Sequence, residues 1–257
     1  MDLRLGGSVA VVTGAARGLG LAIAQAFQAE GAQVVRLDVD ASVAGGNGYV
    51  VDVTDPNAVG EVAAAIRARW GRCDHVVHAA AVGSGKFGFP FWNLDPSDWE
   101  RVLRVNVMGA VHVAHAFAPA MADAGGGTLL FLGSVAGQNG SQTDPPYSAS
   151  KAALLNFAQC AARDLAPRGV RVNCLNPGMV RTALNRSVYE AWAASQPAEG
   201  RPDFETWAAE KIRKLVPLNR WQEPEDVAAM AVFLASSQAG NVTGQAINVD
   251  GGYVMRG

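Results

Sequence analysis

The sequence predicts an α/β fold in which helices flank both faces of a doubly wound parallel sheet. Seven short runs are apolar at nearly every position, which strands buried on both faces require. Helical patterns separate most of these runs, as the right-handed crossovers of a parallel sheet do. The 257 residues are 49% hydrophobic and 17% charged, and this length and composition let one core form. We therefore expect a single domain over residues 1–257.

The first half of the chain supplies four expected strands and two expected helices. One connection is short, because residues 39–48 alone separate the second strand from the third. Three glycines within it disfavour a helix, so we expect a loop or at most one helical turn. The expected strands are 8–14, 33–38, 49–53 and 75–80, and the helices are 18–31 and 56–71.

The second half supplies three more expected strands, at 128–134, 171–178 and 246–252, and a helix at 224–237. Residues 180–217 are irregular, with two helical fragments and several aromatic and arginine side chains. Such an insertion is typical of a substrate lid or an oligomer contact. We interpret it as a substrate lid within the one domain.

Charge and composition point to a small-molecule partner. The net charge of −2 and the pI near 6.1 give no broad positive field, so we expect no nucleic-acid and no membrane partner. The N-terminus lacks the long apolar segment of a secretory signal, and no apolar stretch has the length of a membrane span. Cys73, Cys160 and Cys174 are unpatterned and predict reduced core thiols. We expect a cytoplasmic protein.

A glycine-rich loop, "VTGAARGLG", follows the first expected strand and begins the first helix. Gly14, Gly18 and Gly20 let a backbone approach a pyrophosphate closely, and the helix N-terminus offers unpaired N–H groups. This strand, turn and helix context predicts a dinucleotide site.

Asp38 ends the second expected strand, where a carboxylate can accept hydrogen bonds from the adenosine ribose hydroxyls and repel a 2′-phosphate. The residue predicts NAD rather than NADP. Arg17 argues the other way, because a guanidinium can meet a 2′-phosphate, or it is a solvated loop residue. Asp52 either accepts from the adenine amino group or caps the next turn.

Tyr147 and Lys151 in "YSASK" lie one helical turn apart, so the Lys151 ammonium can approach the phenol. With the oxidised nicotinamide it would lower the tyrosine pKa and allow general acid/base work. Ser134, at a strand end, can hold the reacting oxygen, and Asn106 could hold a water that links Lys151 to solvent. Alone, the pair would be one packed aromatic and one solvated charge; the whole set indicates catalysis.

With the glycine loop, Asn106, Ser134, "YSASK" and "NPG" in this order, the whole chain resembles the short-chain dehydrogenase/reductase family. The resemblance implies a single-domain Rossmann fold with a seven-stranded sheet, a homotetramer, and hydride transfer between NAD(P) and an alcohol or carbonyl. It places Val180 and Thr182 at the nicotinamide carboxamide and phosphates, although Thr182 could simply cap the following helix. The other expected cofactor contacts are Leu19, Val53, Ala79, Ala80, Pro177 and Gly178.

One segment departs from the family, because His78, Ala79, Ala80 and Ala81 stand where Asn-Asn-Ala-Gly is usual. His78 could replace the first asparagine as a hydrogen-bonding residue within the sheet. No histidine or acidic cluster has metal-ligand spacing, so we expect no metal.

The substrate pocket is expected to combine aromatic and amide side chains. Phe87, Phe89, Phe91 and Trp92 would supply walls, while Gln138, Asn139 and Gln142 would hydrogen-bond hydroxyl groups, a mixture that suits a sugar or polyol. Alternatively the aromatics pack within their own loop and the amides face solvent. Met179 is a further expected substrate contact.

The short 39–48 link and the long lid are similar to the aldose and polyol dehydrogenases of the family. Two alternatives remain: a dehydrogenase of hydrophobic cyclic alcohols, dihydrodiols or steroids, and a non-catalytic dinucleotide-binding sensor or assembly partner.

Overall fold

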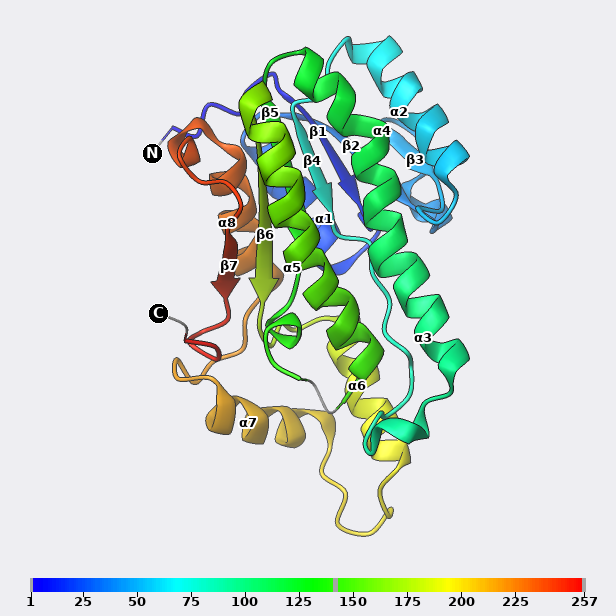
Figure 1. The fold of residues 1–257 in the computed structure, drawn as a ribbon. Helices are drawn as coiled ribbons and strands as arrows, with labels where there is room; N and C mark the ends of the chain where they lie inside the picture. The colour runs from blue at the N-terminus through cyan, green and yellow to red at the C-terminus, as the bar shows by residue number, and fades with distance from the viewer. Residues whose placement is uncertain (1, 141–142, 256–257) are drawn as a thin grey trace.

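The computed structural model describes residues 2–140 and 143–255. Its seven strands form one sheet in the order β3-β2-β1-β4-β5-β6-β7, and every neighbouring pair is parallel (Figure 1). The predicted doubly wound α/β fold is therefore confirmed. The strands are β1 (Val9–Thr13), β2 (Gln33–Asp38), β3 (Gly48–Val50), β4 (His75–His78), β5 (Gly127–Leu132), β6 (Val170–Pro177) and β7 (Ala246–Val249).

Helices cover both faces of this sheet, each with its own apolar core. On one face, Val59, Phe117 and Leu154 pack against the strands from three different helices. On the other, Phe27 and Val227 do the same. The helices of the first face are α2 (Pro56–Trp70), α4 (Gly109–Asp123) and α5 (Pro145–Leu165), and those of the second are α1 (Gly18–Ala29) and α8 (Pro224–Ala235).

The short link between β2 and β3 contains a single 3₁₀ turn, Ala41–Val43, capped by the Asp40 carboxylate on the Ser42 N–H. This confirms the predicted loop with at most one turn. The irregular segment forms the two expected helical pieces, α6 (Ala183–Ala194) and α7 (Phe204–Leu215).

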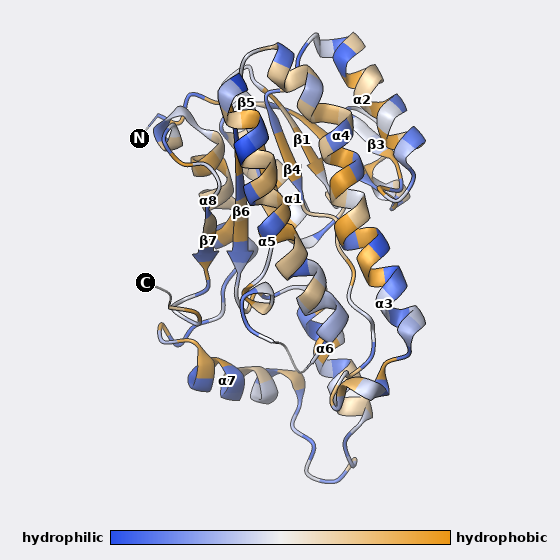
Figure 2. Cartoon of the chain, in the orientation of Figure 1, coloured by the Kyte–Doolittle hydropathy of each residue, from blue (hydrophilic) through white to orange (hydrophobic). Residues whose placement is uncertain are grey.

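The helix Pro96–Asp123 has the length and composition of a membrane span, contrary to the expectation that no stretch would. It joins α3 (Pro96–Leu103), a π-helical turn (Arg104–Met108) and α4. Figure 2 shows hydrophobic residues along α4, and Val113, Phe117 and Met121 are buried against the sheet. Burial in the core thus accounts for the apolar composition.

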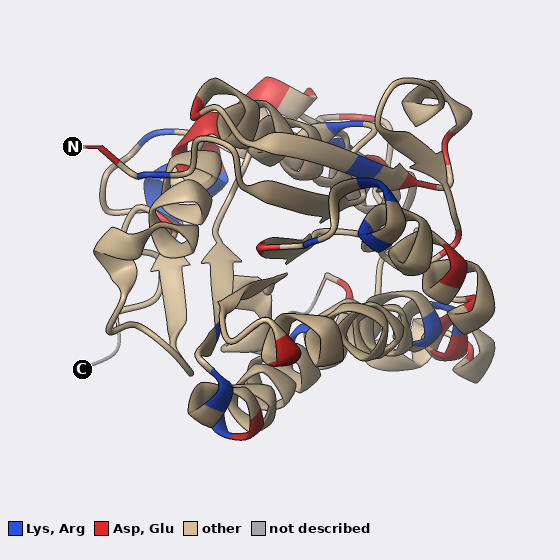
Figure 3. Ribbon diagram, turned by 90° about the horizontal axis from the view of Figure 1, so that it is seen from above, with Lys and Arg blue, Asp and Glu red and all other residues tan. Residues whose placement is uncertain are grey.

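Two further expectations from the composition concern the distribution of charge and the burial of the cysteines. Lys and Arg alternate with Asp and Glu over the elements seen in Figure 3, with neither sign dominating the view. The three cysteines are free thiols, but Cys160 is exposed and Cys73 half-buried, so only Cys174 is a fully buried core thiol.

All strands run the same way, so their carboxyl ends meet at one edge of the sheet. The strand order reverses between β1 and β4, where Thr13 pairs in register with His78. Open α/β sheets bind ligands in the crevice at such a reversal. The fold therefore places the site beside the loops that follow β1, β4, β5 and β6.

Candidate active site

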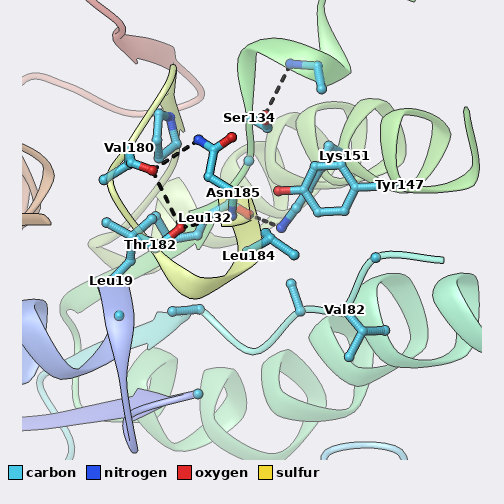
Figure 4. A pocket seen from close by; sticks show the side chains of 18 of the residues that line it. Leu19, Val82, Leu132, Ser134, Tyr147, Lys151, Val180, Thr182, Leu184 and Asn185 are labelled. Atoms are coloured by element: carbon cyan, nitrogen blue, oxygen red, sulfur yellow. Dashed lines mark hydrogen bonds between the residues drawn. The ribbon is translucent and has the colours of Figure 1, made fainter. Parts of the chain in front are cut away.

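A cavity of about 860 Å³ lies at this edge of the sheet. It extends from the glycine loop and Asp38 past Ser134 and Tyr147 to α6 and α7. Figure 4 shows Ser134, Tyr147 and Lys151 at one part of it and Leu19 and Thr182 at another. The cavity thus joins the predicted cofactor residues to the predicted catalytic residues.

The glycine loop has no room for side chains. A Cβ on Gly20 would lie 2.1 Å from the Gly14 carbonyl oxygen, and one on Gly14, where φ is +65°, would lie 2.8 Å from Ala80. Helix α1 begins at Gly18, and Arg17 gives it no side-chain cap. Its first N–H groups therefore face the cavity without a capping side chain, an arrangement that fits a pyrophosphate.

The Asp38 carboxylate is fixed at the end of β2 beside this loop. One oxygen accepts from the Ala16 N–H at 2.9 Å and the other from the Asp40 N–H at 3.0 Å. Each oxygen keeps a lone pair for a ribose hydroxyl. Arg17 is exposed and lies 3.9 Å from Asp40, a distance typical of a weak surface pair.

Asp52 and Val53 also line the cavity. Asp52 also accepts from the Thr54 N–H at 2.9 Å. The capping alternative for Asp52 is thus confirmed, and its second oxygen is left for a ligand.

The segment that departs from the family is held by Thr13, which in turn hydrogen-bonds His78. The Thr13 hydroxyl oxygen accepts from the N–H groups of Ala79 and Ala80, both at 3.1 Å, so its own proton is donated to His78 Nδ1 at 3.1 Å. This fixes the His78 proton on Nε2, which is buried without a partner among the described residues. Burial lowers the pKa of His78 to about 3. His78 therefore takes the predicted hydrogen-bonding role within the sheet.

Tyr147 and Lys151 lie in the first two turns of α5, whose N-cap is Asp144. Asp144 accepts from the Tyr147 N–H at 3.3 Å, and the Ser134 hydroxyl hydrogen-bonds the phenol. The Lys151 Nζ lies 5.4 Å from the centre of the Tyr147 ring and donates to the Leu132 carbonyl at 2.6 Å. The structure thus brings the three predicted residues together.

The pKa of Tyr147 differs from the expectation. Burial raises the pKa of Tyr147 to about 12 and outweighs the hydrogen bond from Ser134, while burial lowers the pKa of Lys151 to about 8. The sequence predicted a lowered tyrosine pKa because it counted the oxidised nicotinamide. In the protein alone, desolvation of the phenolate dominates.

Asn106 lies outside the cavity lining and connects two neighbouring segments by hydrogen bonds. It lies in the π-helical turn, where its Oδ1 accepts from the Val82 N–H at 2.8 Å. Its Nδ2 donates to the Val82 carbonyl and to the Ser150 hydroxyl, both at 2.9 Å. Both amide hydrogens are already used, so the side chain has no donor left for the predicted water. A water could still donate to an oxygen of Asn106, so the water-holding role stays a prediction, and the side chain ties the loop after β4 to α5.

The expected substrate residues divide into two groups. Asn139 and Met179 line the cavity, whereas the Gln138 amide exchanges hydrogen bonds with Asn248 at 2.8 and 2.9 Å and lies outside the lining. Gln142 falls outside the described residues.

The aromatic walls expected from the loop after β4 are absent from the cavity lining. Phe89, Phe91 and Trp92 are 52%, 65% and 71% exposed, and Phe91 and Trp92 pack edge to face against each other. The alternative that these rings pack within their own loop is closer to the structure. Loop side chains have no periodic face from which a direction can be read.

The walls come from helices α6 and α7, whose cavity-facing residues were not predicted individually from the sequence. Leu184 and Val188 of α6 line the cavity with Lys211 and Leu215 of α7, and Tyr253 adds a ring. Each helix contributes two lining residues at positions i and i+4, and this spacing in the sequence could have indicated which residues share the cavity-facing side of the helix. The predicted Pro177, Gly178, Val180 and Thr182 also line the cavity.

The position of Thr182 is compatible with both of its expected roles. Its hydroxyl accepts from the Asn185 N–H at 3.4 Å and so caps α6, and its methyl lies near Gly18, 4.0 Å from where a Cβ would stand. Among the described residues, no group of three or more His, Cys, Asp or Glu side chains could hold a metal.

Comparison with known proteins gives one consistent family. Residues 14–254 match the family model described as enoyl-(acyl carrier protein) reductase. D-threitol dehydrogenase of Mycolicibacterium smegmatis is 33% identical, over 99% of this chain and 96% of the relative. The 3-oxoacyl-[acyl-carrier-protein] reductase FabG of Thermotoga maritima is 32% identical, over 98% and 100%. The structure of L-sorbose reductase from Gluconobacter frateurii with NADPH and L-sorbose is 29% identical, with a TM-score of 0.89 over 100% of both chains.

Proposed function

The chain belongs to the short-chain dehydrogenase/reductase family, and we propose that it is an NAD-dependent dehydrogenase of a sugar, sugar derivative or polyol. The observation that carries the proposal is one cavity holding Ser134, Tyr147 and Lys151 at one end and Asp38 beside the glycine loop at the other. A pure binding module has no need for a phenol that is hydrogen-bonded to Ser134 in a cofactor cavity, so the non-catalytic alternative is disfavoured.

NAD, when bound, supplies the hydride acceptor. The chain's own residues manage the oxygen and its proton. Ser134 holds the substrate hydroxyl. Tyr147 Oη takes its proton as the carbonyl forms, once the positive charges of Lys151 and of the oxidised nicotinamide have lowered the Tyr147 pKa enough to give the phenolate. Lys151, whose pKa burial lowers to about 8, places a titrating ammonium beside the phenol and can bind ribose hydroxyls. Asn106 keeps the loop after β4 against α5, which holds Tyr147 in position.

The preference for NAD rests on Asp38. Its carboxylate is held by two backbone N–H groups, so it cannot swing away from a 2′-phosphate without losing both. The structural neighbour L-sorbose reductase is bound to NADPH, so the fold alone does not select NAD, and the choice for this chain is a proposal from Asp38.

The sugar or polyol assignment draws on two features. D-threitol dehydrogenase and L-sorbose reductase, by their names, act on polyhydroxylated compounds, and Asn139, Tyr253 and Ser134 give this cavity hydroxyl partners. A second candidate is a hydrophobic cyclic alcohol, dihydrodiol or steroid, which the apolar wall of Leu184, Val188 and Leu215 favours. FabG as a relative adds a carbonyl compound on a carrier as a class to test.

We further propose that residues 1–257 act as one domain, that 180–217 form its substrate lid, and that the enzyme is a cytoplasmic homotetramer without a metal. The lid assignment is supported by cavity-lining residues in both α6 and α7. The tetramer is what the family resemblance implies.

The test is NADH formation with aldoses, sugar acids, polyols, cyclic alcohols, steroids and 3-hydroxyacyl thioesters, with Tyr147→Phe as the matched blank. Turnover of a sugar or polyol that falls at least about 1,000-fold in Tyr147→Phe, with cofactor affinity unchanged, is the expected result. Turnover that survives in Tyr147→Phe would overturn the acid/base assignment. Tyr147-dependent turnover of steroids alone would move the substrate to the second candidate.

A further inference from the structure

One cation in the cavity has no counterion. Lys211 lies on α7 and lines the cavity. Within residues 2–140 and 143–255, no carboxylate lies within 4.0 Å of its Nζ and no acceptor receives a hydrogen bond from it. The favourable contact that the structure shows is with the face of Trp207, whose ring centre is 4.0 Å from Nζ.

The surroundings of this cation are apolar. Leu184, Val188 and Leu215 line the same cavity. Lys211 is half-buried, and Trp207 beneath it is only 5% exposed. Burial lowers the pKa of Lys211, because the ammonium loses water that the protein does not replace. An unpaired charge in such a place costs free energy unless a ligand brings an opposite charge.

Three other charged side chains of the cavity already have protein partners, whereas Arg17 is an exposed residue at the glycine loop with a weak pair to Asp40 at 3.9 Å. Asp144 accepts from the Ser84 and Tyr147 N–H groups, and Lys151 donates to the Leu132 carbonyl. Asp38 is held by two backbone N–H groups. Lys211 therefore offers three free donors where the others have protein partners.

The position of Lys211 favours the substrate over the cofactor phosphates. The pyrophosphate is expected at Gly18, near Thr182. Leu184 instead lies by Gly83 on the loop after β4, 3.7 Å from where a Cβ there would stand. Ile212, next to Lys211, packs against Met179, an expected substrate contact.

We propose that Lys211 determines specificity by binding an anionic group, a carboxylate or a phosphate, carried by the substrate. The inference rests on the proposed function and narrows its substrate to an acidic sugar derivative, such as a sugar acid or sugar phosphate. Packing on the Trp207 ring orients the Lys211 ammonium, and helix α7 places it at the end of the substrate away from the reacting hydroxyl.

The test uses matched substrate sets with NAD: glucose, glucuronate and glucose 6-phosphate, then the galactose equivalents, then galactitol and galactonate. For each we would measure kcat/KM and, with the protein–NADH complex, affinity by calorimetry. Wild type should prefer one acidic member over its neutral partner. Lys211→Met should lower kcat/KM or affinity for that member about 10- to 100-fold and change its neutral partner by less than about threefold.

Lys214→Met is the matched control, because Lys214 is on the same helix, exposed and outside the cavity lining. Lys211→Arg should keep part of the preference, since it keeps the charge. The preferred acidic substrate distinguishes the two anions: a preference for the sugar acid indicates a carboxylate, and a preference for the sugar phosphate indicates a phosphate.

Three results would overturn the proposal: neutral members bind as well as acidic ones, no acidic member binds at all, or Lys211→Met weakens all members equally. A loss confined to NADH affinity would assign Lys211 to the cofactor and equally defeat it. Failure of the proposed function is distinct, because it appears as an absence of Tyr147-dependent NADH formation while acid binding persists.

Discussion

Replacing Asp38 by alanine should reverse much of the preference for NAD. Two unit charges about 4 Å apart repel by about 1 kcal/mol in bulk water and about 4 kcal/mol at an effective dielectric near 20. Asp38 is half-buried, so we take about 2 kcal/mol for a 2′-phosphate, or roughly 30-fold in affinity. Loss of charged hydrogen bonds to the ribose removes about 1.5 kcal/mol or more of NAD binding. Together these shift the NAD to NADP ratio by at least about 100-fold.

The ratio is measured as kcat/KM for each cofactor and, independently of substrate, as dissociation constants of NADH and NADPH. Asp40→Asn is the control, because Asp40 is an exposed carboxylate two residues away that faces Arg17 at 3.9 Å. We expect its ratio to stay within about threefold of wild type. A ratio that is unchanged in Asp38→Ala, or that moves equally in Asp40→Asn, would refute the ribose argument.

Two further predictions concern the glycine loop and the sheet beneath it. Gly20→Ala should weaken cofactor binding at least about 10-fold in calorimetry, because its Cβ would lie 2.1 Å from the Gly14 carbonyl oxygen. Gly60→Ala is the control and should leave cofactor affinity unchanged, because a Cβ there has nothing within 4 Å. Equal losses of affinity in the two variants would contradict the close-packing argument. His78 stays neutral in the fold because burial lowers its pKa to about 3, so below its unfolded pKa of about 6.5 only the unfolded chain gains the proton. Its contribution to the free energy of unfolding should fall by about 2 kcal/mol from pH 7 to pH 5, and urea titrations of His78→Asn should lack that part of the loss; an identical pH dependence in the variant would defeat the assignment.

The strands and the location of the site could be predicted because both follow from backbone geometry. A run that is apolar on both faces can only be satisfied between two helical layers, and parallel strands necessarily end at one edge. Once the glycine loop, Asp38 and Ser134 were assigned to strand ends, their common location followed. Tyr147 and Lys151 were equally constrained, because a helix fixes the spacing of side chains four residues apart.

The pocket walls could not be predicted to the same degree. Phe91 and Trp92 are large apolar side chains, and transfer from water favours their burial, yet the loop that carries them leaves both exposed. Gln138 was a sound hydrogen-bonding candidate, but Asn248, 110 residues away, takes its amide. Neither outcome has a local signal, since each depends on the path of a loop or on a partner distant in sequence.

The same distinction separates the reaction from its specificity. The groups proposed to act on the reacting oxygen follow β5 and lie in α5, where Ser134 comes two residues after the buried strand and the Asp144 side chain accepts from the Tyr147 N–H. The groups that would choose the substrate come from α6 and α7, which pack mainly on each other through Tyr189, Trp192 and Trp207. Because this aromatic cluster, rather than the sheet, holds Lys211 in place, residues there can change without disturbing the acid/base pair. In the proposed function, chemistry and substrate choice thus belong to two separately stabilised parts of one cavity.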